Sequence, residues 1–156
     1  MLRHAASDRF RMNSTTYAPQ PANRATILVV QNDPLLLGLV SGSLRPEGHQ
    51  VIESSSPLEA LNLSAQDFQA IDLVVTAVSC RPITGIEFAR RLARRGIDVA
   101  VLYVSASQSL ANAIAGSLGQ SAVIAEPFTG AELRSRVRKC LAAQRRKTRR
   151  DSGPAD

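Results

Sequence analysis

The sequence is poor in the residues that build disulfide-bonded and metal-binding proteins. It contains no Trp, two Cys and only 4% aromatic residues in 156 positions. Cys80 and Cys140 form neither a disulfide framework nor a metal-ligand spacing, so we expect two reduced thiols, with Cys80 the more accessible. His4 and His49 have no partner in the sequence and are expected at the surface. No metal site and no cofactor is predicted.

Long hydrophobic runs are also missing. The longest ones, such as Leu35-Leu36-Leu37, are far shorter than the roughly 20 residues that a membrane-spanning helix needs. The first residues lack the apolar segment of a secretory signal, so a cytoplasmic protein is expected. With 44% hydrophobic residues, the chain can form one globular domain with an aliphatic core, and it is too short for a second domain.

The net charge of +6 is concentrated at the two ends of the chain. Residues 1–25 carry four Arg against Asp8, and residues 134–156 carry nine Lys and Arg against Asp151 and Asp156. Residues 26–133 hold six Arg and ten acidic residues, so this part is mildly acidic. We therefore predict a disordered basic arm at 1–25, a folded domain at 26–143 and a disordered basic tail at 144–156.

Strands and helices are expected to alternate five times within the domain. Aliphatic and β-branched runs predict strands at 26–30, 50–52, 73–75, 99–104 and 122–125. Capping residues and helical periodicity predict helices at 34–44, 56–66, 86–95, 107–118 and 129–143. This alternation implies an α/β fold with a parallel sheet that is covered on both faces.

The first predicted helix carries two leucines that bear on function. Its buried face is expected to contain Leu36, Leu39, Val40 and Ser43. With this face buried, Leu35 and Leu37 are expected at its edge, where they are partly exposed. Asp33, beside Pro34, is expected to cap this helix rather than to bind a metal.

Four segments of the chain point to a known family. They are ILVVQNDPLLLGLV, DLVVTAVSCRPITGIEFARRL, VLYVSAS and VIAEPF, in this order. Together they resemble the receiver domain of bacterial response regulators, over Thr26 to about Ala143. The resemblance implies a flavodoxin-like (βα)5 sandwich with a five-stranded parallel sheet, a role in two-component or phosphorelay signalling, and a cis peptide bond before Pro127.

Five positions decide what chemistry this resemblance implies. In a working receiver, two acids after the first strand bind Mg²⁺ and an aspartate after the third strand accepts the phosphoryl group. A Ser or Thr then hydrogen-bonds that group, and a lysine after the fifth strand pairs with it. These positions correspond to Gln31, Asn32, Ala77, Ser105 and Glu126. Only Ser105 keeps the type of residue that the family uses, and it is expected to bond local backbone.

The other four residues each remove part of that chemistry. The methyl group of Ala77 offers no oxygen for an acyl phosphate, and the amides of Gln31 and Asn32 lack the charge of the carboxylates that Mg²⁺ sites use. Glu126 reverses the charge at the lysine position, where one unit pair at about 4 Å is worth on the order of 4 kcal/mol at an effective dielectric near 20. We therefore expect a pseudo-receiver that is not an enzyme and has weak or no Mg²⁺ binding.

Three functions remain open from the sequence. The first is a stand-alone, phosphorylation-independent module that binds a histidine kinase, a phosphotransfer protein or another receiver through Leu35 and Leu37. The second is binding of a polyanion such as nucleic acid, without sequence preference. Its predicted residues are Arg145, Arg146, Lys147, Arg149 and Arg150. The third and least favoured is an active phosphoacceptor that uses another acid.

Overall fold

Five parallel strands form one sheet in the computed structural model, which describes residues 24–153. The strands are β1 (Thr26–Val30), β2 (Gln50–Ser54), β3 (Leu73–Ala77), β4 (Ala100–Ser105) and β5 (Val123–Ala125). They lie in the order β2-β1-β3-β4-β5, and every neighbouring pair is parallel. This is the flavodoxin-like strand order, so the predicted fold class is confirmed.

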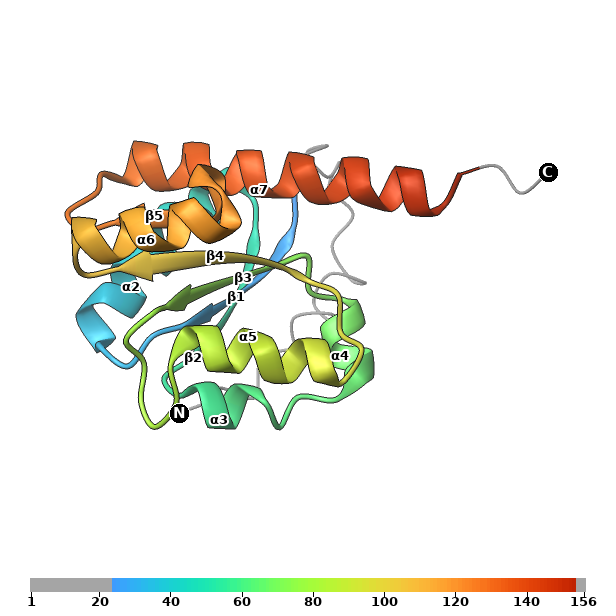
Figure 1. Ribbon diagram of the computed structural model, residues 1–156, viewed down its shortest axis with the longest axis horizontal. Coiled ribbons are helices and arrows are strands. Elements are labelled where there is room, and N and C mark those ends of the chain that lie inside the picture. The colour runs from blue at the N-terminus through green and yellow to red at the C-terminus, as the bar shows by residue number, and fades with distance from the viewer. Residues whose placement is uncertain (1–23, 154–156) are drawn as a thin grey trace.

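Helices cover both faces of the sheet, as Figure 1 shows. They are α2 (Pro34–Leu44), α3 (Pro57–Ala60), α4 (Ala65–Gln69), α5 (Gly85–Arg94), α6 (Gln108–Leu118) and α7 (Gly130–Asp151), with short 3-10 turns at Arg45–Glu47 and Gln120–Ala122. The helices α2 and α7 pack over one buried cluster, and α3, α4 and α5 pack over the other. Beside the second group, α6 packs against Tyr103 and Val123.

The central parts of β1 and β3 are apolar on both faces, and both faces of the sheet are buried. In β1, Ile27 and Val29 belong to the cluster under α2 and α7, whereas Leu28 and Val30 belong to the opposite cluster. Continuous apolar runs of this kind are typical of parallel strands between two helical layers. Within residues 24–153, the structure contains no helix with the length and hydropathy of a membrane span.

The buried face of α2 differs from the predicted one. It consists of Leu37, Val40, Ser41 and Leu44. Leu37 is therefore a core residue and not a rim residue, while Leu35 is 84% exposed and Leu39 is 53% exposed. The prediction is wrong because the predicted and the observed face each contain three aliphatic residues and one serine, so the apolar pattern alone does not choose between them. The Ser41 hydroxyl donates a hydrogen bond to the Glu53 carboxylate at 3.1 Å, and both side chains are buried.

The helix predicted at 56–66 is two short helices, α3 and α4. Ser56 is the N-cap of α3, but its side chain makes no capping hydrogen bond. Ser64 starts α4 with a full capping box, in which its hydroxyl accepts from the Asp67 N–H and the Asp67 carboxylate accepts from the Ser64 N–H. A helix start of this strength inside the predicted segment divides it.

The C-terminal tail is helical where we expected disorder. The helix α7 continues to Asp151, so residues 144–151 extend it beyond the core. This segment has neither Gly nor Pro, and it consists mainly of residues with good helix propensity. Lys147 also pairs with Asp98 at 2.9 Å, which holds the extension against the residues before β4. The arm predicted at 1–25 and His4 lie outside the described residues, apart from Arg24 and Ala25.

Cys80 and His49 are buried, although Cys80 is predicted to be the more accessible thiol and His49 to lie at the surface. Cys80 and Cys140 are both buried, and burial raises the pKa of each thiol. His49 is also buried, and its Nδ1 accepts a hydrogen bond from the Ala25 N–H at 3.0 Å. Burial is the main cause that lowers the pKa of His49 below its ordinary value of 6.5. Its neutral ring therefore acts as an acceptor that fixes the residue just before β1.

Candidate functional site

The carboxyl ends of the strands bring together the five positions singled out in the sequence. Gln31 and Asn32 follow β1, Ala77 ends β3, Ser105 ends β4 and Glu126 follows β5. The strand register pairs Val30 with Thr76, Ala77 with Val104, and Ser105 with Ala125. These pairings place all five positions at one edge of the sheet, which is where ligands bind in open α/β folds.

Asn32 joins three segments at this edge through its side-chain amide. Its Nδ2 donates to the Ser55 carbonyl at 2.6 Å and to the Arg81 carbonyl at 3.1 Å. Its Oδ1 accepts from the Arg81 N–H at 2.6 Å. The amide thus links the loop after β1 to the loops after β2 and β3. A carboxylate could make only the last of these three bonds, because it has no donor.

The oxygens of Gln31 and Asp33 are also engaged in local hydrogen bonds. Gln31 is buried, and its Oε1 accepts from the Asp33 N–H at 3.1 Å. Asp33 Oδ1 accepts from the Leu35 N–H at 2.9 Å, which confirms the predicted helix cap. Both side chains therefore stabilise the turn into α2.

The end of β3 is closely packed around Ala77. A Cβ atom on Gly85 would lie 2.1 Å from the Ala77 carbonyl oxygen, so only glycine fits at the start of α5. Thr76 Oγ1 donates to the same carbonyl at 3.1 Å. Cys80 lies beneath the loop, 3.8 Å from the Val30 carbonyl oxygen. Its raised pKa keeps the thiol protonated, which argues against a nucleophilic role.

Ser105 and Glu126 complete the edge on the side of β4 and β5. Ser105 is fully buried, and its hydroxyl donates to the Ser107 carbonyl at 2.8 Å, as expected for a local backbone contact. The Glu126 N–H donates to the Ser105 carbonyl at 2.8 Å. The Glu126–Pro127 peptide bond is cis, which confirms that prediction. The half-buried Glu126 side chain brings a carboxylate to the position where a receiver has its lysine.

These residues do not fit a Mg²⁺ ion. Such a site needs one or two carboxylates with oxygens open to the metal. The Asn32 and Gln31 oxygens accept backbone hydrogen bonds, one oxygen of Asp33 caps α2, and Ala77 has no side-chain oxygen. Among residues 24–153, no three His, Cys, Asp or Glu side chains gather as a possible metal site.

The family of the chain follows from this fold together with the match to a family model. The model described as the response regulator receiver domain matches residues 27–138. The chain belongs to this family. The matched region contains the strands β2 to β5, all of β1 except Thr26, and all five positions of the candidate site.

Curated members of the receiver family support the same assignment. The alkaline phosphatase synthesis transcriptional regulatory protein SphR of Synechococcus elongatus is 30% identical over 139 residues, which cover 83% of this chain and 54% of SphR. The response regulator MprA of a Mycobacterium species is 33% identical over 129 residues, covering 82% of this chain and 54% of MprA. The chain thus spans about half the length of these relatives.

Solved receiver structures show the same fold. The receiver domain protein from Clostridium thermocellum superposes with a TM-score of 0.68 at 24% identity, covering 78% of this chain and 97% of that one. NtrX from Brucella abortus gives a TM-score of 0.72 at 23% identity, covering 85% of this chain and 31% of NtrX. At these identities the likeness concerns the fold alone.

The remaining predicted residues lie on the helices α2 and α7. Leu35 is at the start of α2, fully on the surface, and the basic residues 145–150 lie along the end of α7. Sequence reasoning missed the bridge made by Asn32. The amide of Asn32 could have indicated this bridge. An amide both donates and accepts hydrogen bonds and can therefore bind the N–H of one loop and the carbonyl of another, whereas an ionised carboxylate only accepts.

Proposed function

We propose that this receiver domain works by binding a protein partner and does so without being phosphorylated. The observation that carries the proposal is the bridge made by Asn32. It uses both polar ends of the amide to hold three loops together at the place where a phosphorylated receiver would hold its metal. With Ala77 at the end of β3, the site supports a structural role for these residues and no phosphoryl chemistry.

The exposed face of α2 is the surface best suited to a protein partner. Leu35 and Leu39 lie one turn apart with 84% and 53% of their surface exposed. Gly38 and Gly42 lie on the same exposed side, and a Cβ atom at either would meet nothing within 4 Å. Two leucines beside two glycines form an apolar face without projecting side chains between them, against which a partner helix can pack closely.

Burial of these leucines would contribute a useful share of a binding energy. Each fully buried leucine is worth roughly 1.5 to 3 kcal/mol, compared with about 8 kcal/mol for a micromolar complex. The proposed partners are a histidine kinase, a phosphotransfer protein or another receiver. All three can present a helix to α2.

The test compares two double variants, each of which replaces two exposed leucines with serine. Leu35→Ser with Leu39→Ser alters the proposed face, whereas Leu58→Ser with Leu118→Ser alters two exposed leucines elsewhere, on α3 and α6. Binding is measured by titration with purified kinases, phosphotransfer proteins and receivers from the same genome, and folding by thermal melting. Loss of binding in the first variant alone, at an unchanged melting temperature, supports the proposal. Equal binding by both variants contradicts it.

A second function, polyanion binding, is supported by the charge of α7. Between residues 134 and 150 this helix has nine Lys and Arg and no acidic residue. Arg134 and Arg138 pair with Glu47, and Lys147 pairs with Asp98. Arg145, Arg146, Arg149 and Arg150 extend the basic surface to the end of the helix. A surface of this kind binds phosphate backbones by releasing their counterions.

A further inference from the structure

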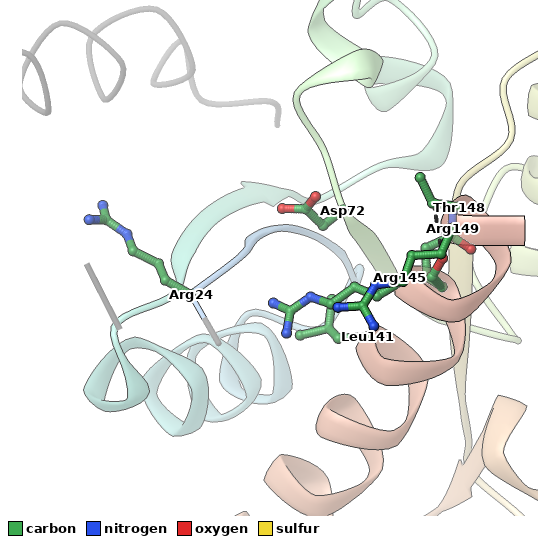
Figure 2. Close-up of a pocket in the computed structure, with 7 residues that line it drawn as sticks. Arg24, Asp72, Leu141, Arg145, Thr148 and Arg149 are labelled. Atoms are coloured by element: carbon green, nitrogen blue, oxygen red, sulfur yellow. Dashed lines mark hydrogen bonds between the residues drawn. The ribbon is translucent and has the colours of Figure 1, made fainter. Parts of the chain in front are cut away.

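A cavity of about 360 Å³ lies at the edge of the sheet opposite the candidate functional site. The helix α7 supplies Leu141, Arg145 and Arg149 to its lining. Arg24, two residues before β1, and Asp72, directly before β3, line it from the sheet. Figure 2 shows Arg24 and Asp72 on one side and the residues of α7 on the other.

The extra length of α7 creates this cavity. The core residues of α7 end at Leu141, and the helix then continues to Asp151 past the starts of the strands. An exposed ion pair between Lys147 and Asp98 joins this extension to the residues before β4. Leu141 therefore provides an apolar surface within the cavity, and the turns that follow add the charged side chains.

The lining has an excess of positive charge. Arg145 and Arg149 are four residues apart, so they lie one above the other on the same side of α7. Among the residues that line the cavity, Asp72 is the one acid, against three arginines. One Asp72 oxygen already accepts from the Thr26 N–H at 2.9 Å. The charge of Arg145 also acts on this region, since it adds to burial in lowering the pKa of His49.

We propose that the cavity binds a phosphate group carried by a small molecule of about mononucleotide size. Guanidinium groups match phosphate oxygens with paired hydrogen bonds, and two of them one helical turn apart can contact the same group. Leu141 offers apolar contact to the rest of the ligand, and Asp72 offers an acceptor for a hydroxyl or amino group. The volume lies at the lower end of the roughly 300 to 1,000 Å³ that is usual for small-ligand sites.

This inference goes beyond the proposed function and does not depend on it. The α2 face and the cavity use different residues, so either can fail without the other. Arg145 and Arg149 do belong to the basic surface of α7, and a control on the same helix is therefore needed. Arg146 and Arg150 have the same spacing and the same charge, but they do not line the cavity.

The experiment is a calorimetric titration of the full chain with inorganic phosphate, ADP, adenosine and a mixed-sequence DNA duplex. We expect phosphate and ADP to bind saturably, adenosine not to bind, and the affinity for ADP to fall as salt is raised. Arg145→Ala with Arg149→Ala should weaken ADP binding by about tenfold or more, because two charge-assisted contacts are lost. Arg146→Ala with Arg150→Ala should leave it within about twofold.

Several results would overturn the inference. Equal losses in the two double variants would assign the binding to the general charge of α7. Binding of the duplex without binding of phosphate or ADP would assign it to a nucleic-acid surface. Absence of saturable binding of phosphate and ADP to the unaltered chain would exclude the site. Arg145→Lys with Arg149→Lys keeps the charge, so full ADP affinity in that variant would contradict the role of the guanidinium groups.

Discussion

Asn32 combines a donor and an acceptor at a point where three loops meet. Because its amide bonds to both the N–H and the carbonyl of Arg81, it fixes the loop after β3 in one position. The third bond, to the Ser55 carbonyl, fixes the loop after β2. A single amide thus holds three loops together at the ends of the strands.

Replacement of Asn32 by Asp should therefore destabilise the protein. Asn32→Asp removes both donors and places a negative charge against two carbonyl oxygens. We expect the free energy of unfolding to fall by about 1 kcal/mol, since the lost bonds are partly open to water. Chemical denaturation measures the change. Asn32→Ala removes the same bonds without adding charge, and a gain of stability in the Asp variant would show that the bridge is unimportant.

His49 should make stability depend on pH. Its pKa in the folded state is below 6.5, mainly through burial and also through Arg145 and Arg138, against the opposing effects of Glu47 and Asp72. As the pH falls, the unfolded chain therefore binds a proton at His49 more readily than the folded chain does. The stability that neutral His49 contributes is fully present above about pH 6.5 and is lost as the pH falls through the folded pKa. The expected result is a lower free energy of unfolding at about pH 5 than at about pH 7.5.

The control for this prediction is His49→Asn, whose side-chain oxygen can replace Nδ1 as acceptor for the Ala25 N–H. Because other groups also titrate in this range, the quantity compared is the difference between the two proteins at each pH. That difference should change with pH in the predicted direction. A constant difference would mean that His49 does not titrate in the way that its burial implies.

The helix α2 shows why a correct helix can be given a wrong face. Its bounds were predictable from Asp33, Pro34 and the stop at Pro46. Its phase was not, because Ser41 and Glu53 form a buried polar pair that only the fold brings together. The predicted face contains Ser43 and the observed face contains Ser41, each beside three aliphatic residues, so the sequence pattern did not distinguish the two faces. As a result Leu39 was assigned to the core and Leu37 to the rim.

The glycines of α2 allow a test in which stability and binding change in opposite directions. Gly38→Ala with Gly42→Ala should raise the free energy of unfolding by up to about 1 kcal/mol per site, because both positions are open and alanine favours helix. The same methyl groups should keep a partner helix at a distance and weaken its binding. Gly116→Ala in α6 is the matched control, since it is also open. It should raise stability and leave binding unchanged, and unaltered binding in the α2 variant would argue against a closely packed partner.

The last turns of α7 add positive charge to the molecule but contribute no residue to its core. Truncation after Ala143 removes Arg145, Arg146, Lys147, Arg149 and Arg150. The core residues of α7 all precede the cut, so the domain should remain folded. Affinity for a mixed DNA duplex at low salt should fall, together with its dependence on salt. Fluorescence anisotropy at several salt concentrations measures both, and equal affinities of the two proteins would contradict polyanion binding by α7.

The fold was largely predictable because its signals are local and repeated. Five apolar runs, each followed by a helix, leave few alternatives to a parallel sheet covered on both faces. The five positions of the site were also predictable, since the ends of parallel strands meet at one edge. The cavity beside Arg145 and Arg149 was not predictable. It depends on where α7 passes over the sheet, and no local pattern contains that information.

We propose that this receiver domain acts without Mg²⁺ and without a phosphoryl group at β3. The most direct test is a titration of the full chain with Mg²⁺, alone and with beryllofluoride as a phosphoryl mimic, followed by backbone NMR. We predict no saturable shift of the amide signals of Asn32, Ala77 or Ser105, because no carboxylate at these positions can hold the metal or the mimic. Localised shifts at these residues that saturate in the millimolar range or below would contradict the account.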